Sequence, residues 1–333
     1  MKPADIDTVI GIFRQRDDFL LTTHVNPDGD GLGSELALGA GLRRAGKRVR
    51  IVNYSPTPGH YLWLDPGGLV EHYSPGTHDR AIAAAGVIVI LDTNQPDRLR
   101  SMEGPVLASG ALRVVMDHHL NPHPFADAYL IDDAATSTGE LVFRLLSAMP
   151  GGHLGPDVAV ALYTAIMTDT GSFRYPRTGA ETHRITAKLI EEGADPPTVF
   201  SLIYETWSPG RMRLLGEALD TLTVSHGGAV AHMLATRKMF NGTGTTETET
   251  DTFSVYPMNI LGVRIGMLFT ELADGVKISF RSKGTIPVNR LAREFGGNGH
   301  LNASGARLHN VSLDGVVTDV LKAAEKYIDN PVV

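Results

Sequence analysis

The 333-residue sequence contains no cysteine. This absence excludes disulfides, thiolate zinc sites and cysteine nucleophiles. Long apolar runs are also missing: the longest covers residues 81–91, is too short to span a bilayer and leads directly into Asp92. The first ten residues, MKPADIDTVI, lack the apolar region of a signal peptide. We therefore expect a cytoplasmic protein without a membrane partner.

Basic residues are outnumbered, because 30 Lys and Arg face 37 Asp and Glu and give a formal net charge of −7. Long duplex DNA is not expected as a partner, since its binding requires a large basic surface. A short anionic ligand can still bind through a local basic pocket or through metal ions. The hydrophobic content of 42% is typical of a globular chain, and the length predicts about two domains.

Strand-like and helix-like segments alternate in the first half of the chain. The pattern predicts strands at residues 18–23, 48–53, 87–91 and 113–116, and helices at residues 32–45, 137–148 and 158–167. This alternation predicts an α/β fold whose N-terminal part is a doubly wound, mostly parallel sheet. Ligands of such sheets bind at the carboxyl ends of the strands.

The pattern changes after about Gly193. A helical pattern at 198–222 is interrupted at 208–210, strand patterns follow at 229–234, 263–270 and 276–282, and a Thr/Glu tract at 242–252 predicts a surface loop. We predict an N-terminal domain over 1–190, a linker over 191–215 and a smaller C-terminal α/β domain over 216–333.

Carboxylates and imidazoles follow several of the predicted strands and helices. They are His24, Asp28, Asp30, Asp92, Asp117, His118, His119 and Asp169. Each one alone can be explained as a turn or a helix cap, and Ser137 and Glu140 have the spacing of a capping box. Together, the oxygen and imidazole ligands suit Mn²⁺, with Mg²⁺ and Zn²⁺ as alternatives. They exceed the needs of one ion, which favours two ions about 3.5–4 Å apart and bridged by a carboxylate.

A glycine-rich segment in the second half, FGGNGHLNASGAR at 295–307, could bring backbone N–H groups close to an anion. Arg281 ends a predicted strand. The simpler alternatives are a glycine-rich turn between a strand and a helix, and a solvated charge at a strand edge.

Six segments in chain order resemble the DHH phosphoesterase superfamily. They are HVNPDGDGLGS, LDTN, MDHH, TDTGSFRY, FRSKG and GGNGHLNASGA, and the likeness covers roughly residues 18–310. The two-domain size most resembles the branch of short-oligonucleotide exonucleases, the nanoRNases, also described as bifunctional oligoribonucleases and 3′-phosphoadenosine 5′-phosphate (PAP) phosphatases. This resemblance implies a catalytic DHH domain followed by a substrate-binding domain. It also implies hydrolysis of short oligonucleotides to nucleoside 5′-monophosphates, and of PAP to AMP.

The resemblance also implies roles for individual residues. The metal ligands would be His24 and Asp28 for one ion, Asp30, His118 and Asp169 for the other, and Asp92 as the bridge. Asp117 would orient the neighbouring His118, and His119 would face the scissile phosphate. The substrate contacts of the second domain would be Arg281, Gly297, Asn298, Gly299, His300 and Ser304.

Other interpretations of the same residues remain open. Cyclic di-adenylate, pyrophosphate or polyphosphate could be the substrate of the same ligand set, because only the second domain distinguishes them. A non-catalytic nucleotide-binding module is an alternative from another class. A homodimer is compatible with the sequence.

Overall fold

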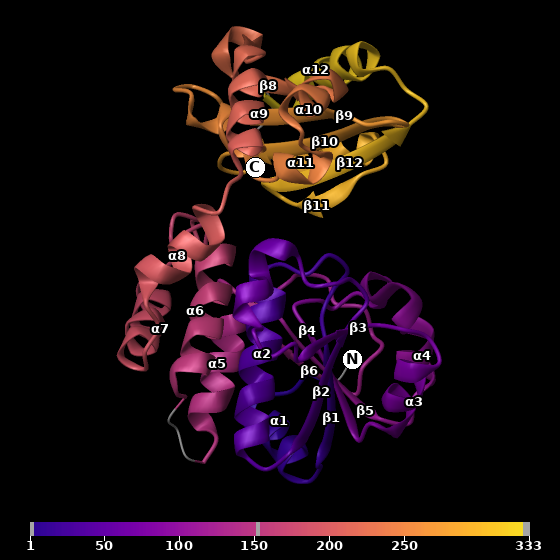
Figure 1. Ribbon diagram of the computed structural model, residues 1–333, viewed down its shortest axis with the longest axis vertical. Coiled ribbons are helices and arrows are strands. Elements are labelled where there is room, and N and C mark those ends of the chain that lie inside the picture. The colour runs from indigo at the N-terminus through magenta and orange to yellow at the C-terminus, as the bar shows by residue number, and fades with distance from the viewer. Residues whose placement is uncertain (1–2, 151–153, 329–333) are drawn as a thin grey trace. The chain divides into compact units, whose positions relative to one another are not determined.

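The computed structural model describes residues 3–150 and 154–328, and it divides into two units, Met1–Thr206 and Trp207–Val333 (Figure 1). The division falls inside the predicted linker at 191–215. Much of that range is helical instead, because prolines open both α8 (Pro196–Tyr204) and α9 (Pro209–Asp220). Within the described residues, no helix combines the length and the apolar character needed to cross a membrane.

A six-stranded parallel sheet forms the centre of the first unit. Its strands are β1 (Asp18–Thr22), β2 (Arg48–Asn53), β3 (Val70–His72), β4 (Val87–Leu91), β5 (Leu112–Asp117) and β6 (Ala128–Ile131). They lie in the order β3-β2-β1-β4-β5-β6, and every neighbouring pair is parallel. The order reverses between β1 and β4, and ligands of doubly wound sheets bind at such a switch point.

Helices cover both faces of this sheet (Figure 1). One face carries α1 (Ile6–Arg14), α2 (Gly29–Arg44), α5 (Thr138–Ala148), α6 (Pro156–Asp169), α7 (Ala180–Glu191) and α8, and the other carries α3 (Thr77–Ala84) and α4 (Glu103–Ala108). All five residues of β4 are buried, alternately towards the two faces, which explains their uninterrupted apolar run. The predicted doubly wound α/β fold is confirmed.

Helices α2 and α6 pack closely because α2 carries glycine at the contact. A Cβ atom at Gly33 would lie only 2.3 Å from the carbonyl oxygen of Ala161, and one at Gly29 would lie 2.5 Å from Oγ1 of Thr168. The close approach brings the first turn of α2 against the last turn of α6. Both ends carry predicted metal ligands.

The second unit contains a mixed sheet with helices on both faces. Its strands are β7 (Thr223–Ser225), β8 (Val230–Ala235), β9 (Ile265–Glu271), β10 (Gly275–Ser282), β11 (Asn298–His300) and β12 (Ala303–His309), in the order β11-β12-β10-β9-β8-β7. Only β8 and β9 pair in parallel among these described strands. Helices α9 and α10 (Arg237–Thr243) pack on one face, and α11 (Val288–Glu294) and α12 (Leu313–Ile328) on the other. The smaller C-terminal α/β domain is confirmed.

The Thr/Glu tract at 242–252 is not a simple surface loop. Residues Glu247–Thr250 form a 3₁₀ helix, and Thr250 is only 2% exposed. Its hydroxyl donates to the carbonyl oxygen of Glu247, so the threonine is buried without leaving its polar group unsatisfied.

Candidate metal centre

Carboxylates and imidazoles from the carboxyl ends of β1, β4 and β5 meet those at the facing ends of α2 and α6. Three sets each place one potential ligand atom per residue within 4.8 Å of the others: His24, Asp28 and Asp92; Asp30, His118 and Asp169; and Asp92, Asp117, His118 and His119. The structure therefore brings together all eight residues predicted for the N-terminal domain.

The first set surrounds Nε2 of His24. Its Nδ1 atom lies 2.9 Å from the carbonyl oxygen of Val25, which leaves Nε2 directed at Oδ2 of Asp92 (3.2 Å) and Oδ2 of Asp28 (3.7 Å). The other oxygen of Asp28 caps α2 by accepting two backbone N–H bonds from its first turn. Asp28 is thus both the expected helix cap and a potential ligand, because each oxygen has a different partner.

The second set surrounds Nε2 of His118. This atom lies 3.3 Å from Oδ2 of Asp169 and 3.7 Å from Oδ2 of Asp30. Asp30 is buried, and its two oxygens accept the backbone N–H groups of Thr138 (2.7 Å) and Gly139 (2.9 Å). These are the first amides of α5, so the N-terminus of that helix stabilises the carboxylate and fixes its orientation.

Asp92 lies between the two sets. It follows β4 with a φ of 60°, a left-handed conformation that Asp tolerates better than most residues. Its Oδ2 atom faces His24, while Oδ1 lies 3.7 Å from both His118 Nε2 and His119 Nδ1 and accepts a hydrogen bond from the Thr138 hydroxyl at 3.1 Å. One carboxylate therefore presents a different oxygen to each set.

Asp117 is hydrogen-bonded to the ring of His119, whereas the resemblance implied that it orients the ring of the ligand His118. Oδ1 of Asp117 lies 2.7 Å from Nδ1 of His119 and accepts the backbone N–H of His118 at 2.8 Å. The nearest partner of Nδ1 of His118 is instead the carbonyl oxygen of Ala135, at 3.4 Å. The rings of His118 and His119 nevertheless both face Asp92, and their centres lie 4.5 Å apart.

The carboxylates of the cluster disturb one another's protonation. Burial, followed by the charges of Asp92 and Asp28, raises the pKa of Asp169 to about 8, and burial also raises the pKa of Asp30 well above its usual value. Burial alone would lower the pKa of His24, but hydrogen bonds with Asp28 and Asp92 outweigh it and raise that pKa to about 10. Crowded carboxylates of this kind are stabilised by added positive charge.

The residues present fit divalent cations. The ligand atoms are carboxylate oxygens and imidazole nitrogens, which bind such ions readily. Among the described residues, the buried atoms that lack a hydrogen-bond partner include His118 Nε2 and Asp117 Oδ2. A buried imidazole nitrogen that lacks a hydrogen-bond partner and faces three carboxylates is the arrangement expected of a ligand whose partner is an ion.

Comparison with known proteins identifies the family of the chain. Residues 18–166 match the model of the N-terminal domain of the DHH family, and residues 228–330 match the DHHA1 domain. The bifunctional oligoribonuclease and PAP phosphatase NrnA of Bacillus subtilis is 30% identical over 88% of this chain and 90% of its own. The chain belongs to the DHH family. The family predicted from the sequence is thereby confirmed, as is an enzyme of the phosphoesterase class.

Other proteins similar to this DHH-family chain have names that refer to different activities. A crystal structure of an exopolyphosphatase-related protein from Bacteroides fragilis is 31% identical with a TM-score of 0.92 and covers 98% of this chain and 97% of its own. The cyclic-di-AMP phosphodiesterase PdeA of Listeria monocytogenes is 26% identical over 95% of this chain but only 48% of its own. The manganese-bound structure of the exonuclease RecJ, at 14% identity and a TM-score of 0.54, shares the fold.

The segment STGE contains more than the predicted helix cap. Ser137 Oγ accepts the backbone N–H of Glu140 at 3.2 Å, which confirms Ser137 as the cap of α5. The two residues between them, Thr138 and Gly139, hold Asp30 and were not predicted. A Cβ atom at Gly139 would lie 2.7 Å from the Cβ atom of Ala165, so only glycine fits against α6 here. The sequence signal was the adjacent Thr-Gly pair at a helix start.

A second layer behind the centre was also missed from the sequence. Glu35 on α2 is fully buried, and its Oε1 atom accepts a hydrogen bond from Nδ2 of Asn53 at 2.6 Å. Oδ1 of Asn53 in turn accepts the backbone N–H of Thr23 at 3.2 Å, immediately before His24. Glu35 and Asn53 therefore connect α2 and β2 to the end of β1.

Glu35→Gln should remove a pH dependence of stability. Burial raises the pKa of Glu35 from its ordinary value of 4.5 to about 8, although the Asn53 hydrogen bond opposes this rise. The protonated form is favoured in the fold, so its stabilisation is complete below pH 4.5 and is lost as pH rises towards 8. A tenfold change in an acid dissociation constant corresponds to about 1.4 kcal/mol. Urea unfolding with chelator present should show the free energy of unfolding of the native protein falling by several kcal/mol relative to Glu35→Gln between pH 5 and pH 8.

The control for that experiment is Glu191→Gln, because Glu191 lies exposed at the end of α7. Its free energy of unfolding should follow that of the native protein at both pH values. If the free energy of unfolding changed with pH in the same way for the native protein and for Glu35→Gln, ionisation of Glu35 would not destabilise the fold.

In the DHHA1 domain, the glycine-rich segment follows helix α11 and forms the β11–β12 hairpin, so it is not a turn between a strand and a helix. A Cβ atom at Gly297 would lie 2.2 Å from the carbonyl oxygen of Gly305. At Gly299, where φ is 145°, it would lie 2.6 Å from the carbonyl oxygen of Ala303. Close packing of the hairpin therefore explains these two glycines, while Asn298 between them is exposed.

The remaining predicted residues of this domain lie around the same hairpin. Arg281 on β10 and His300 on β11 both pair with Ala303 on β12. Because β10 lies inside the sheet, Arg281 is not the strand-edge charge that the simpler alternative required. The Ser304 hydroxyl donates to the carbonyl oxygen of His300 at 2.7 Å, and Nη1 of Arg281 donates to that of Phe280 at 2.9 Å.

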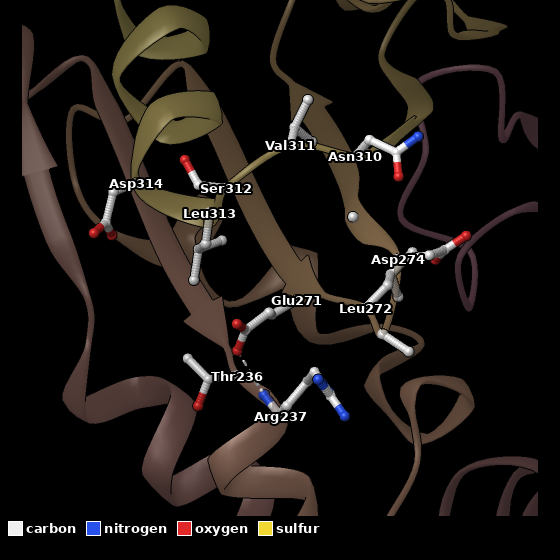
Figure 2. Close-up of a pocket in the computed structure, with 12 residues that line it drawn as sticks. Thr236, Arg237, Glu271, Leu272, Asp274, Asn310, Val311, Ser312, Leu313 and Asp314 are labelled. Atoms are coloured by element: carbon white, nitrogen blue, oxygen red, sulfur yellow. Dashed lines mark hydrogen bonds between the residues drawn. The ribbon is translucent and has the colours of Figure 1, made fainter.

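A cavity of about 720 Å³ lies elsewhere in this domain, between the β9–β10 turn, the segment before α12 and the start of α10 (Figure 2). Figure 2 shows the Glu271 carboxylate directed at the backbone of Arg237, whose N–H it accepts at 2.9 Å. None of the site residues predicted from the sequence, all of them described, lines this cavity.

Proposed function

We propose that the protein hydrolyses short oligonucleotides to nucleoside 5′-monophosphates, and PAP to AMP. The observation that carries this proposal is the position of Asp92, whose two carboxylate oxygens face separate sets of ligands. Such a pair of sets suits phosphoryl chemistry assisted by two ions. Relatives at 29–30% identity that carry the name NrnA support the substrate class.

The proposed cofactors are two divalent ions, with Mn²⁺ favoured over Mg²⁺. The residues that would hold them are His24 and Asp28 for one ion, Asp30, His118 and Asp169 for the other, and Asp92 for both. When bound, the ions would neutralise charge on the phosphate and lower the pKa of a nearby water.

His119 would contact the scissile phosphate. Its side chain is 21% exposed, and Asp117 holds Nδ1, so Nε2 would be the donor towards substrate. Burial alone would lower the pKa of His119, but the hydrogen bond with Asp117 and the charges of Asp92, Asp117 and Asp169 together outweigh burial and raise that pKa to about 9. A protonated Nε2 can stabilise a phosphoryl oxygen or give its proton to the leaving oxygen.

The second domain would bind the terminal nucleotide or its phosphate. The proposed contacts are Arg281, Gly297, Asn298, Gly299, His300 and Ser304. Arg281 and His300 pair with the same residue of β12, which supports a common role. The backbone of the glycine-rich hairpin can approach an anion closely.

A panel of substrates tests the proposal. With Mn²⁺ and with Mg²⁺, we expect a dinucleotide and PAP to yield 5′-monophosphates in chromatography, and pyrophosphate and cyclic di-adenylate to react much more slowly. Rapid turnover of cyclic di-adenylate would favour the second candidate, which the similarity to PdeA supports. Turnover of pyrophosphate alone would contradict the proposal.

A further inference from the structure

The segment between α6 and α7 carries a basic side chain, Arg177, to which the sequence analysis assigned no role. Arg177 is exposed, and its Nη1 atom donates to the carbonyl oxygens of Asp133 (2.9 Å) and Ala135 (3.3 Å). These bonds tie the turn after Asp169 to the segment that precedes α5. The guanidinium is therefore held by the backbone of two segments that flank the metal centre.

The guanidinium lies beside the second ligand set. The carbonyl oxygen of Ala135 that accepts from Arg177 is also the partner of Nδ1 of His118, so both side chains meet at one oxygen atom. The positive charge of Arg177 therefore lies next to His118 of the second ligand set.

A cation at this rim would attract a phosphate group beyond the scissile one. The ions proposed for the centre would be held by its five carboxylates, those of Asp28, Asp30, Asp92, Asp117 and Asp169, whereas Arg177 is a positive charge outside that set. Both bonds of Arg177 to the backbone use Nη1, so Nε and Nη2 can present the planar fork that matches a phosphate. Its exposure places Arg177 outside the floor of the centre, where His119 and Asp92 lie.

We propose that Arg177 is a substrate-binding residue that contacts the phosphate adjacent to the scissile one and thereby selects 5′-phosphorylated over unphosphorylated dinucleotides. This inference rests on the proposed function and deepens it. The substrate class that it favours is a short oligonucleotide with at least two phosphate groups.

The test compares pApA, which has a 5′-phosphate and one scissile phosphate, with ApA, which has the scissile phosphate alone. Arg177→Gln should lower kcat/KM for pApA about 10-fold, mainly by raising KM, which corresponds to about 1.4 kcal/mol. The same substitution should change kcat/KM for ApA by less than about twofold. Arg177→Lys should restore part of the preference because it restores the charge without the fork. Arg184→Gln is the matched control, since Arg184 is exposed on α7 and pairs with Glu181 at 2.9 Å.

Two results would overturn the inference. An unchanged ratio between pApA and ApA would show that Arg177 does not contact the second phosphate, and an equal loss on both substrates would show that it acts only as a backbone tether. Calorimetric binding of pApA to the Mn²⁺-loaded protein separates this test from the proposed function. If no variant hydrolysed pApA but only the Arg177 variants bound it more weakly, the proposed function alone would be contradicted. If the native protein and all variants bound pApA equally well, the inference about Arg177 would be contradicted.

Discussion

Asp92→Asn should reduce turnover of a dinucleotide by roughly 10³-fold or more while the fold is retained. Asn keeps the volume of the side chain and tolerates the φ of 60°, so the backbone after β4 is not strained. The substitution removes the negative charge from the one carboxylate that faces both ligand sets. Steady-state kinetics at saturating Mn²⁺, with bound metal counted by elemental analysis after dialysis, should show both activity and metal content reduced.

Asp97→Asn provides the control, because Asp97 lies exposed five residues further along the same connection. It should leave kcat and metal content unchanged. Circular dichroism should show that metal-free Asp92→Asn is folded, with part of its stability lost because the attraction between Asp92 and His24 is weakened. An Asp92→Asn enzyme with native kcat would exclude the bridging role.

His119→Gln should lower kcat by about 10²–10⁴-fold with little change in metal binding. The His119 ring is held by Asp117, and it is more exposed than the side chains of Asp30 and His118. It can therefore reach substrate without being needed to hold an ion. Asp117→Asn should produce a smaller loss of kcat, because it weakens the orientation of the ring rather than removing it.

The matched control is His72→Gln, at an exposed histidine that ends β3. Rapid-quench kinetics at saturating substrate would separate the chemical step from product release. If His119→Gln raised KM and left kcat intact, His119 would serve ground-state binding only, and if it lost metal, the residue would belong among the ligands.

The parts of the fold carried by local pattern could be predicted from the sequence. The strands at 48–53 and 87–91 have the predicted bounds, since an apolar or β-branched run between turn residues defines both ends. The helix predicted from residue 32 begins at Gly29 instead, because Asp28 caps it three residues earlier. The eight N-terminal ligand candidates could be named because each follows a strand or lies at a helix end, where a doubly wound sheet gathers them.

Contacts between distant segments could not be predicted in this way. The hydrogen bonds from the start of α5 to Asp30 join residues more than one hundred positions apart, and the sequence pattern indicates only a cap. The pairing of Asp117 with His119 depends on which way consecutive side chains point at the end of β5. The glycines of the hairpin suggested an anion site, whereas close packing against β12 already requires them.

All of these ligands lie where the strands end or where helices meet that edge of the sheet. The opposite edge, where the strands begin, contains the short connections α2–β2 and α3–β4. In the first of these, Ala45 and Gly46 are exposed, and Gly46 should be kept because its φ is 79°. For protein engineering, this edge is suitable for attaching a fluorophore or inserting a module, because lengthening a connection there would not displace the predicted metal ligands at the other edge.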